Sequence, residues 1–231
     1  MMKGTGTLYG VGVGPGDPRL LTFRAAEIIC GSPVLAVPGS GSDSRAAYEI
    51  AKAALPQVGR KELLILSMPM VKDADELERS HNRAALQLAE RLQAGQDVAF
   101  LTLGDPSIYS TYAYLHRRVQ KMGFAVEMIP GVSSFCAAAA KLGEALVSGG
   151  EALHLLPASY GVKEGLCLGG TRVLMKAGRE LPEVLHLLHE RGERAMLVQN
   201  CGMENERVCR RLEGKVPPDY FTILIVKEEG E

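Results

Sequence analysis

The chain has 231 residues, of which 46% are hydrophobic and 23% charged, and its net charge is −1. This length suits one large or two small domains, the composition favours a packed core, and the charge offers no general attraction to nucleic acid. Five cysteines without a C-x-x-C pair argue against a disulfide framework and a zinc site. The sequence shows no signal-peptide pattern and no apolar run of 18 residues, so we expect a cytoplasmic protein without a membrane partner.

Strands and helices are predicted to alternate along the first half of the chain. Alternation of this kind implies parallel β-α-β units, and such sheets bind ligands outside the carboxyl ends of their strands. Apolar runs predict strands at 7–13, 33–38, 62–67, 97–104 and 124–130, and helical patterns lie at 18–31, 44–55, 73–95 and 106–123.

A domain boundary is expected near residue 130, where the regular alternation ends. The second half again mixes helices and strands, in a less regular order, and residues 158–170 are expected to form a loop. We therefore predict an α/β fold with two α/β domains, 1–130 and 131–231. The default ligand site of such a protein is the cleft between its domains.

Three glycine-rich turns follow predicted strands. Asp17 and Asp105 each precede a proline, and each can cap a helix whose first position that proline takes; Ser133 can cap the next helix. Capping alone would explain any one of these turns, but three of them on one sheet edge favour a ligand site. Glycines that would let the backbone approach a ligand closely are Gly10, Gly12, Gly14, Gly16, Gly104 and Gly131.

The first of these turns does not fit a phosphate-binding loop. A G-x-G-x-x-G fingerprint would need glycine at Pro15 or at Asp17, and G-x-x-x-x-G-K-[ST] occurs nowhere. The strand at 33–38 also lacks the terminal acidic residue that would bind a ribose. The turn therefore indicates a bulky ligand against bare backbone and disfavours an NAD-dependent enzyme.

The ordered motifs GVGPGDPRLLT, LTLGDPSIYST and IPGVSSFCAAAA resemble those of the tetrapyrrole (corrin/porphyrin) methylase family. The resemblance continues through VLMKAGR, VQNCGMENE and YFTILIVK, so it covers essentially the whole chain. Within the family, MPM, GDPSIYST, NCGMENE and YFTILIVK resemble the branch that methylates precorrin-2 at C-20 in cobalamin biosynthesis. The resemblance implies S-adenosylmethionine as methyl donor, a reduced tetrapyrrole as acceptor, a homodimer and no protein-bound metal. It also favours the early-cobalt, anaerobic route.

The resemblance further implies which residues hold the donor, largely through main-chain groups between the domains. Asp105 can cap a helix, contact the positive end of the donor, or do both, and we favour both. The implied donor-binding residues are Pro15, Leu103, Gly104, Asp105, Ile108, Ser133, Ser134, Met175, Cys201, Phe221 and Thr222.

The acceptor implied by the resemblance carries eight carboxylates, which Arg and Lys bind well. Gly14, Gly16 and Asp17 are expected to form a wall against the macrocycle. An ordinary solvated charge is the alternative for every basic candidate. Our choice for the carboxylates is Lys72, Arg79 and Arg83, with Arg24, Arg45 and Arg179 as further candidates.

A proton acceptor cannot be carried over from the family. The uroporphyrinogen branch has a VYD sequence after its second strand, and this chain has Pro38 at the matching place. Tyr109, Tyr112 and His81 are candidates only because they lie near the motifs. Two alternatives stay open: methylation of another corrin-ring carbon, and a non-enzymatic tetrapyrrole carrier.

Overall fold

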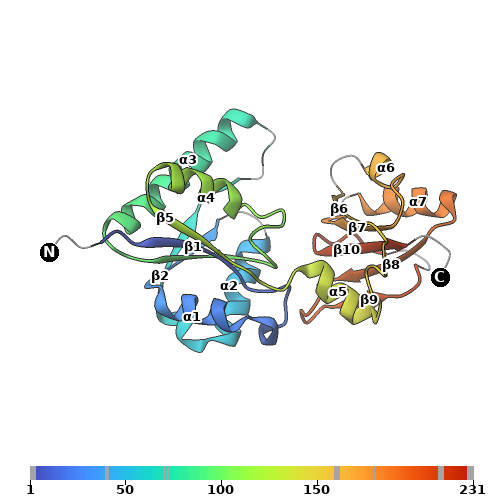
Figure 1. The fold of residues 1–231 in the computed structure, drawn as a ribbon, viewed down its shortest axis with the longest axis horizontal. Helices are drawn as coiled ribbons and strands as arrows, with labels where there is room; N and C mark the ends of the chain where they lie inside the picture. The colour runs from blue at the N-terminus through green and yellow to red at the C-terminus, as the bar shows by residue number, and fades with distance from the viewer. Residues whose placement is uncertain are drawn as a thin grey trace. The chain divides into compact units, whose positions relative to one another are not determined.

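A computed structural model describes residues 4–39, 42–69, 71, 73–158, 162–178, 180–212 and 216–227, with the backbone alone for 42–45. The chain divides into two compact domains, Met1–Ser133 and Ser134–Glu231. Each domain is built on its own five-stranded sheet with helices packed against it (Figure 1).

The first domain contains a parallel sheet with the strand order β3-β2-β4-β1-β5. Its strands are β1 (Thr7–Gly12), β2 (Val34–Pro38), β3 (Glu62–Leu66), β4 (Val98–Thr102) and β5 (Ala125–Ile129). Every neighbouring pair runs parallel. The carboxyl ends of β4, β1 and β5 therefore lie side by side at one edge.

Helices cover both faces of this sheet, as the crossovers between parallel strands require. They are α1 (Phe23–Gly31), α2 (Ser42–Ala54), α3 (Ala74–Gln93) and α4 (Tyr112–Lys121), with the 3-10 turns η1 (Pro18–Leu20) and η2 (Pro56–Arg60). Leu88 of α3 and Leu115 of α4 belong to one buried cluster, and Ile29 of α1 and Ile50 of α2 belong to another. Alternate residues of the fully buried β2 contribute to the two clusters, which accounts for its uninterrupted apolar sequence.

Two helices begin later than the sequence predicted. Asp17 caps only the short η1, while α1 begins after Thr22, whose hydroxyl accepts the amide of Ala25 at 3.1 Å. Residues 106–111 form turns, and α4 begins at Tyr112. The prediction that Asp105 caps a helix is therefore wrong.

The second domain contains a mixed sheet with the strand order β6-β7-β10-β8-β9. Its strands are β6 (Leu153–Pro157), β7 (Thr171–Met175), β8 (Arg194–Gln199), β9 (Arg207–Cys209) and β10 (Thr222–Lys227). β10 runs antiparallel to both β7 and β8, and β6 runs parallel to β7. The start of β10 consequently shares an edge with the carboxyl ends of β7 and β8.

The helices described for the second domain are α5 (Ser134–Leu142), α6 (Val162–Gly165) and α7 (Leu181–Arg191). α7 packs Val184 and Leu188 against Leu174 and Leu224 of the sheet, and α5 contacts β8 and β10. The single turn α6 lies within the segment 158–170 that was expected to be a loop. Among the described residues, no helix combines the length and the apolar character needed to span a bilayer.

Candidate functional site

The turns after β1, β4 and β5 touch one another through main-chain atoms. The amide of Gly14 donates to the carbonyl of Gly104 at 3.3 Å, and the amide of Gly104 donates back at 2.8 Å. A Cβ at Gly131 would lie 2.2 Å from the oxygen of Gly104, and a Cβ at Gly12 would lie 2.5 Å from the same oxygen. Gly12 and Gly131 thus admit a neighbouring turn, whereas the sequence had suggested that they admit a ligand.

The carboxylate of Asp105 fastens two of these turns together. One oxygen accepts the amide of Gly131 at 3.0 Å, and the other accepts the amide and the hydroxyl of Ser107 at 2.8 and 2.5 Å. Both oxygens of Asp105 accept hydrogen bonds from other residues of the chain, so this carboxylate stabilises the turns at the sheet edge. The main chain of Asp105 is better placed than its carboxylate to meet a ligand.

The donor-binding residues predicted for the first domain gather at this edge. Leu103 and Gly104 directly follow β4, and Gly104 has a left-handed φ of +69°. The amide of Ile108 donates to the carbonyl of Asp105 at 3.3 Å. Pro15 is buried in the turn after β1, and Ser133 follows the turn after β5; Ser134 is the first residue of α5 in the second domain.

The residues expected to face the macrocycle lie in the turn after β1. Gly14 and Gly16 are buried, and Gly14 exchanges both of its backbone hydrogen bonds with Gly104. Asp17 forms an ion pair with the exposed Arg19 at 2.6 Å. The negative charge of Asp17 is thus balanced locally.

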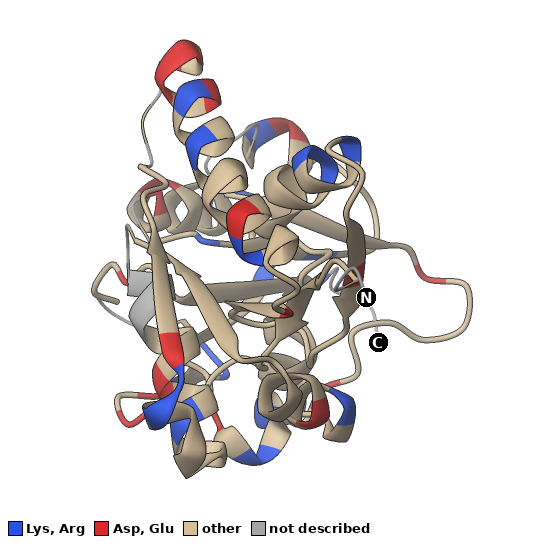
Figure 2. Ribbon diagram, turned by 90° about the vertical axis from the view of Figure 1, so that its left-hand side faces the viewer, with Lys and Arg blue, Asp and Glu red and all other residues tan. Residues whose placement is uncertain are grey.

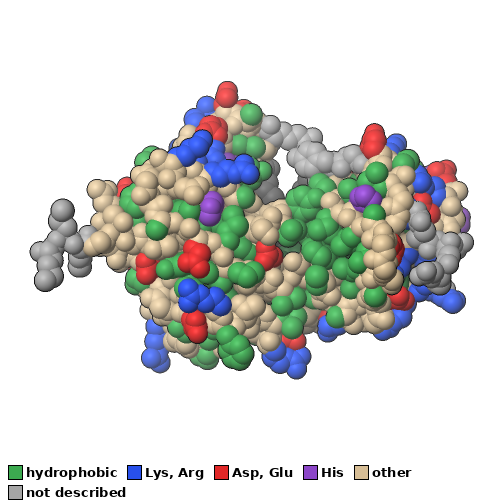
Figure 3. Space-filling view, in the orientation of Figure 1, with side chains coloured by type: hydrophobic (Ala, Val, Ile, Leu, Met, Phe, Trp, Pro, Cys, Tyr) green, Lys and Arg blue, Asp and Glu red, His purple; other side chains and the backbone are tan. Residues whose placement is uncertain are grey.

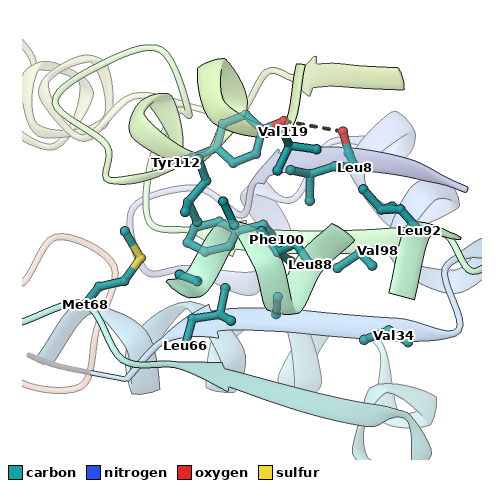
Figure 4. Packing of buried hydrophobic residues seen from close by; sticks show 14 residues of the cluster. Leu8, Val34, Leu66, Met68, Leu88, Leu92, Val98, Phe100, Tyr112 and Val119 are labelled. Atoms are coloured by element: carbon teal, nitrogen blue, oxygen red, sulfur yellow. Dashed lines mark hydrogen bonds between the residues drawn. The ribbon is translucent and has the colours of Figure 1, made fainter. Parts of the chain in front are cut away.

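Tyr112 lies in the core of the first domain and is fully buried. Its ring packs near Phe100, and a Cβ at Gly10 would lie 2.1 Å from a ring carbon (Figure 4). The hydroxyl lies 3.0 Å from the carbonyl of Glu127 and 3.4 Å from that of Leu8. Burial raises the pKa of the Tyr112 phenol well above its ordinary value. This position gives Tyr112 a packing role and explains the glycine at position 10.

The other two acid–base candidates differ in exposure. His81 on α3 is 7% exposed and stacks on Tyr114 with ring centroids 4.8 Å apart. Burial, helped by the positive charge of Arg118, lowers the pKa of His81 and favours the neutral imidazole. Tyr109 is 43% exposed and directly follows Ile108. Of the three candidates, Tyr109 is the one that a ligand at this edge can reach.

The donor-binding residues predicted for the second domain are brought to one edge by strand register. Ile223 pairs with Met175, and Thr222 pairs with Gln199. Thr222 begins β10 at that point, Phe221 directly precedes it, and Cys201 follows the end of β8. Burial, with a smaller contribution from the charge of Glu206, raises the pKa of the Cys201 thiol to about 11.

Within the described ranges, three residues other than glycine have a left-handed backbone: Tyr109 (φ +47°), Lys176 (φ +58°) and Asn200 (φ +51°). Each directly precedes or follows a predicted donor-binding residue, namely Ile108, Met175 or Cys201. This conformation costs roughly 1–3 kcal/mol outside glycine and concentrates at ligand sites. The strained residues therefore mark the same positions as the motifs do.

Of the basic candidates that the structure describes, Arg79 and Arg83 lie on the exposed surface of α3, and Arg24 lies on α1, where it pairs with Glu27 and Glu127. Figure 3 shows basic side chains over α3 and α4, and Figure 2 shows that α3 carries charges of both signs. Arg79 and Arg83 are exposed, and within the described residues neither forms an ion pair. Arg118 of α4, by contrast, is paired with Glu78. Lys72, Arg179 and the side chain of Arg45 lie outside what the structure describes.

Comparison with known proteins identifies the family. The model of the Tetrapyrrole (Corrin/Porphyrin) Methylases matches residues 7–217. The chain belongs to this family. A relative from Methanocaldococcus jannaschii, named probable cobalt-precorrin-2 C(20)-methyltransferase, is 34% identical over 95% of both chains. A precorrin-2 C(20)-methyltransferase from a Sinorhizobium species is 32% identical over 96% of both.

A solved structure agrees with the fold of this tetrapyrrole methylase. The uroporphyrin-III C-methyl transferase from Thermus thermophilus, complexed with S-adenyl homocysteine, gives a TM-score of 0.67 at 22% identity. The match covers 96% of this chain and 98% of the other. At this level of identity the likeness shows the two-domain α/β fold.

Sequence reasoning on this tetrapyrrole methylase overlooked two residues at the second-domain edge. Asn200 and Asp219 are joined by a hydrogen bond of 2.9 Å and flank Cys201 and Phe221. A signal was present, because Asn and Asp favour turns and Asn tolerates a left-handed backbone. Asn200 directly follows β8, and Asp219 lies shortly before β10.

Proposed function

We propose that this tetrapyrrole methylase transfers a methyl group from S-adenosylmethionine to the C-20 meso carbon of precorrin-2 in cobalamin biosynthesis. The observation that carries the proposal is the match, over nearly the whole of both chains, to two relatives named for methylation at C-20. We further propose the cobalt-loaded form as the substrate, as in the anaerobic route; the name of the archaeal relative supports this choice.

We propose that residues of both domains hold the donor. In the first domain these are Pro15, Leu103, Gly104, Asp105 and Ile108; in the second they are Met175, Cys201, Phe221 and Thr222, with Ser133 and Ser134 between the two groups. The fit rests on two observations: glycine turns that meet through main-chain atoms, and left-handed residues beside the predicted contacts. The solved complex of the Thermus relative with the demethylated donor supports the same ligand class.

Methyl transfer from an activated donor requires mainly that the protein align the donor with the acceptor. Bound S-adenosylmethionine would supply an activated methyl group: the acceptor carbon would attack the methyl carbon in line, and S-adenosylhomocysteine would leave. The protein then has to orient the two reactants and exclude water. The raised pKa of Cys201 favours the protonated thiol, which does not compete for the methyl group as a thiolate would.

We propose that Gly14, Gly16 and Asp17 face the macrocycle and that Lys72, Arg79 and Arg83 meet its carboxylates. The exposure of Arg79 and Arg83 is compatible with this role. Tyr109 is the most accessible of the three residues that could accept a proton after methyl transfer.

We also propose a homodimer that acts in the cytoplasm. The family resemblance supports this assembly, and a two-fold dimer is the commonest closed oligomer. Light scattering at micromolar concentration should report twice the mass of the 24.8 kDa chain. A monomer alone would contradict the assembly without affecting the proposed reaction.

The reaction is tested by incubating the protein with S-adenosylmethionine and either metal-free or cobalt-loaded precorrin-2, followed by mass spectrometry and NMR. We expect one added methyl group at C-20 and faster turnover of the cobalt-loaded form. A methyl group at another carbon would favour the alternative that the chain belongs to a different branch. Binding of the tetrapyrrole without consumption of the donor would favour a carrier.

A further inference from the structure

Asp219 lies in the turn before β10 and uses both carboxylate oxygens. One oxygen accepts the amide of Phe221 at 2.9 Å, and the other accepts the side-chain amide of Asn200 at 2.9 Å. The main-chain carbonyl of Asp219 accepts the hydroxyl of Thr222 at 2.5 Å. A single residue thus joins the end of β8 to the start of β10.

The contact with Asn200 holds a strained residue. Asn200 is only 5% exposed and has a φ of +51°, and its own amide donates to the carbonyl of Phe221 at 3.1 Å. Such a backbone persists only where its surroundings fix it. The backbone conformation of Asn200 fixes the direction in which the chain enters Cys201, so Asp219 influences the position of Cys201 through Asn200.

The loop after β7 also packs on Asp219. A Cβ at Gly178 would lie 2.3 Å from the carbonyl oxygen of Asp219, so the two main chains are in direct contact. In the same loop, the ammonium group of Lys176 lies 5.8 Å from the centroid of the Tyr220 ring. The ends of β7 and β8 and the start of β10 therefore share one point of contact.

The geometry points to Asp219 as a positioning residue for the donor half-site of the second domain. This inference rests on the proposed function, because Met175, Cys201, Phe221 and Thr222 are the residues proposed there to hold S-adenosylmethionine. Asp219 shapes the main chain around these four positions. The donor itself does not need to touch its carboxylate, because both oxygens already accept hydrogen bonds from the chain.

The test exchanges the two ends of the Asp219–Asn200 hydrogen bond. In Asp219→Asn, two amide groups face each other, so a buried donor loses its acceptor. In Asn200→Asp, two carboxylates face each other. The double variant places an amide opposite a carboxylate again, and Asp tolerates a left-handed backbone as Asn does. Affinity for S-adenosylhomocysteine is measured by calorimetry, and the KM for S-adenosylmethionine from initial rates.

We expect each single variant to weaken S-adenosylhomocysteine binding about 10-fold, or about 1.4 kcal/mol, and the double variant to recover most of this loss. The KM for the donor should rise with little change in kcat. Glu151→Gln is the matched control: its carboxylate accepts the hydroxyl of Thr171 at 2.6 Å and the amide of Ser148 at 3.1 Å, at the opposite end of β7. This control should bind S-adenosylhomocysteine like wild type.

Two results would overturn the inference. One is a folded single variant whose affinity stays within about twofold of wild type. The other is a double variant that binds no better than the weaker single variant. If one single variant does not fold, the other single variant and the double variant carry the comparison. Wild-type protein that binds no S-adenosylhomocysteine would refute the proposed function itself, so the two failures are distinguishable.

Discussion

Replacing Gly131 with alanine should disturb the carboxyl edge of the first sheet. Gly131 has no left-handed φ, so alanine meets no backbone strain there. Its Cβ, however, would lie 2.2 Å from the oxygen of Gly104 and 2.7 Å from the carbonyl carbon of Gly12. The whole effect of the substitution therefore comes from steric contact between turns.

The size of the effect follows from these distances. Ordinary contact of a Cβ begins at 3.4 Å, so the turn that carries Gly104 must move by roughly 1 Å. Overpacking of this kind costs about 1–3 kcal/mol of unfolding free energy. A displacement of about 1 Å near reacting groups can cost about 100-fold in rate. We expect Gly131→Ala to lose stability in that range and about 100-fold in kcat/KM for the methylation.

Urea unfolding measures the loss of stability, initial rates measure kcat/KM, and calorimetry with S-adenosylhomocysteine shows whether the affinity of the donor site has changed. Gly31→Ala serves as the control, because Gly31 ends α1 with nothing within 4 Å of its added Cβ and without a left-handed φ. That variant should keep wild-type affinity. A Gly131→Ala protein with wild-type stability and wild-type affinity would refute the packing argument for this edge.

Four further outcomes are expected. Tyr112→Phe should lose about 1 kcal/mol of unfolding free energy in urea, because a buried hydrogen bond is lost; its turnover should stay near wild type, and a large drop in a stable protein would make the phenol an acid–base candidate again. Cys201→Ala should keep its affinity for S-adenosylhomocysteine in calorimetry, because the proposed contact uses the backbone; a tenfold loss, about 1.4 kcal/mol, would contradict this. Because the pKa of His81 is lowered in the folded protein, this histidine takes up a proton in the unfolded chain first as pH falls, so the unfolding free energy should decrease below about pH 6.5. His81→Gln should make this decrease shallower, which urea titrations at several pH values would measure. Arg79→Glu with Arg83→Glu should raise the KM for the acceptor, less so at high salt, and leave donor affinity unchanged; a normal KM at low salt would mean that this surface of α3 is only solvated.

The order of elements in the first domain could be predicted because its inner strands β1, β2 and β4 are largely buried on both faces. Val34 to Pro38 is apolar at every position, and strand β4 is nearly so, which makes each strand visible as a continuous run between helical patterns. The amphipathic spacing of α3 gave an equally clear signal. The local sequence pattern is sufficient to predict a strand that is buried on both faces or a helix that is buried on one side.

The details of the sheet edge could not be predicted in the same way. Asp105 looked like a helix cap because a proline follows it, yet its carboxylate is held by Gly131, 26 residues away. The contact between Asp219 and Asn200 likewise depends on β8 and β10 being neighbours. Such partners are set by strand pairing over long separations, and a single sequence read locally carries no record of them.

The central place of β10 has a consequence for synthesis of the chain. Among the described elements of the second domain, this strand leaves the ribosome after all the others, yet it lies between β7 and β8. Until Thr222–Lys227 emerge, β7 and β8 have unpaired edges and cannot join into one sheet, whereas the first domain already has all its strands. A chain that stopped before Thr222 would carry a complete first domain attached to two exposed apolar strands. We expect such a product to aggregate or be degraded rather than to bind the donor weakly.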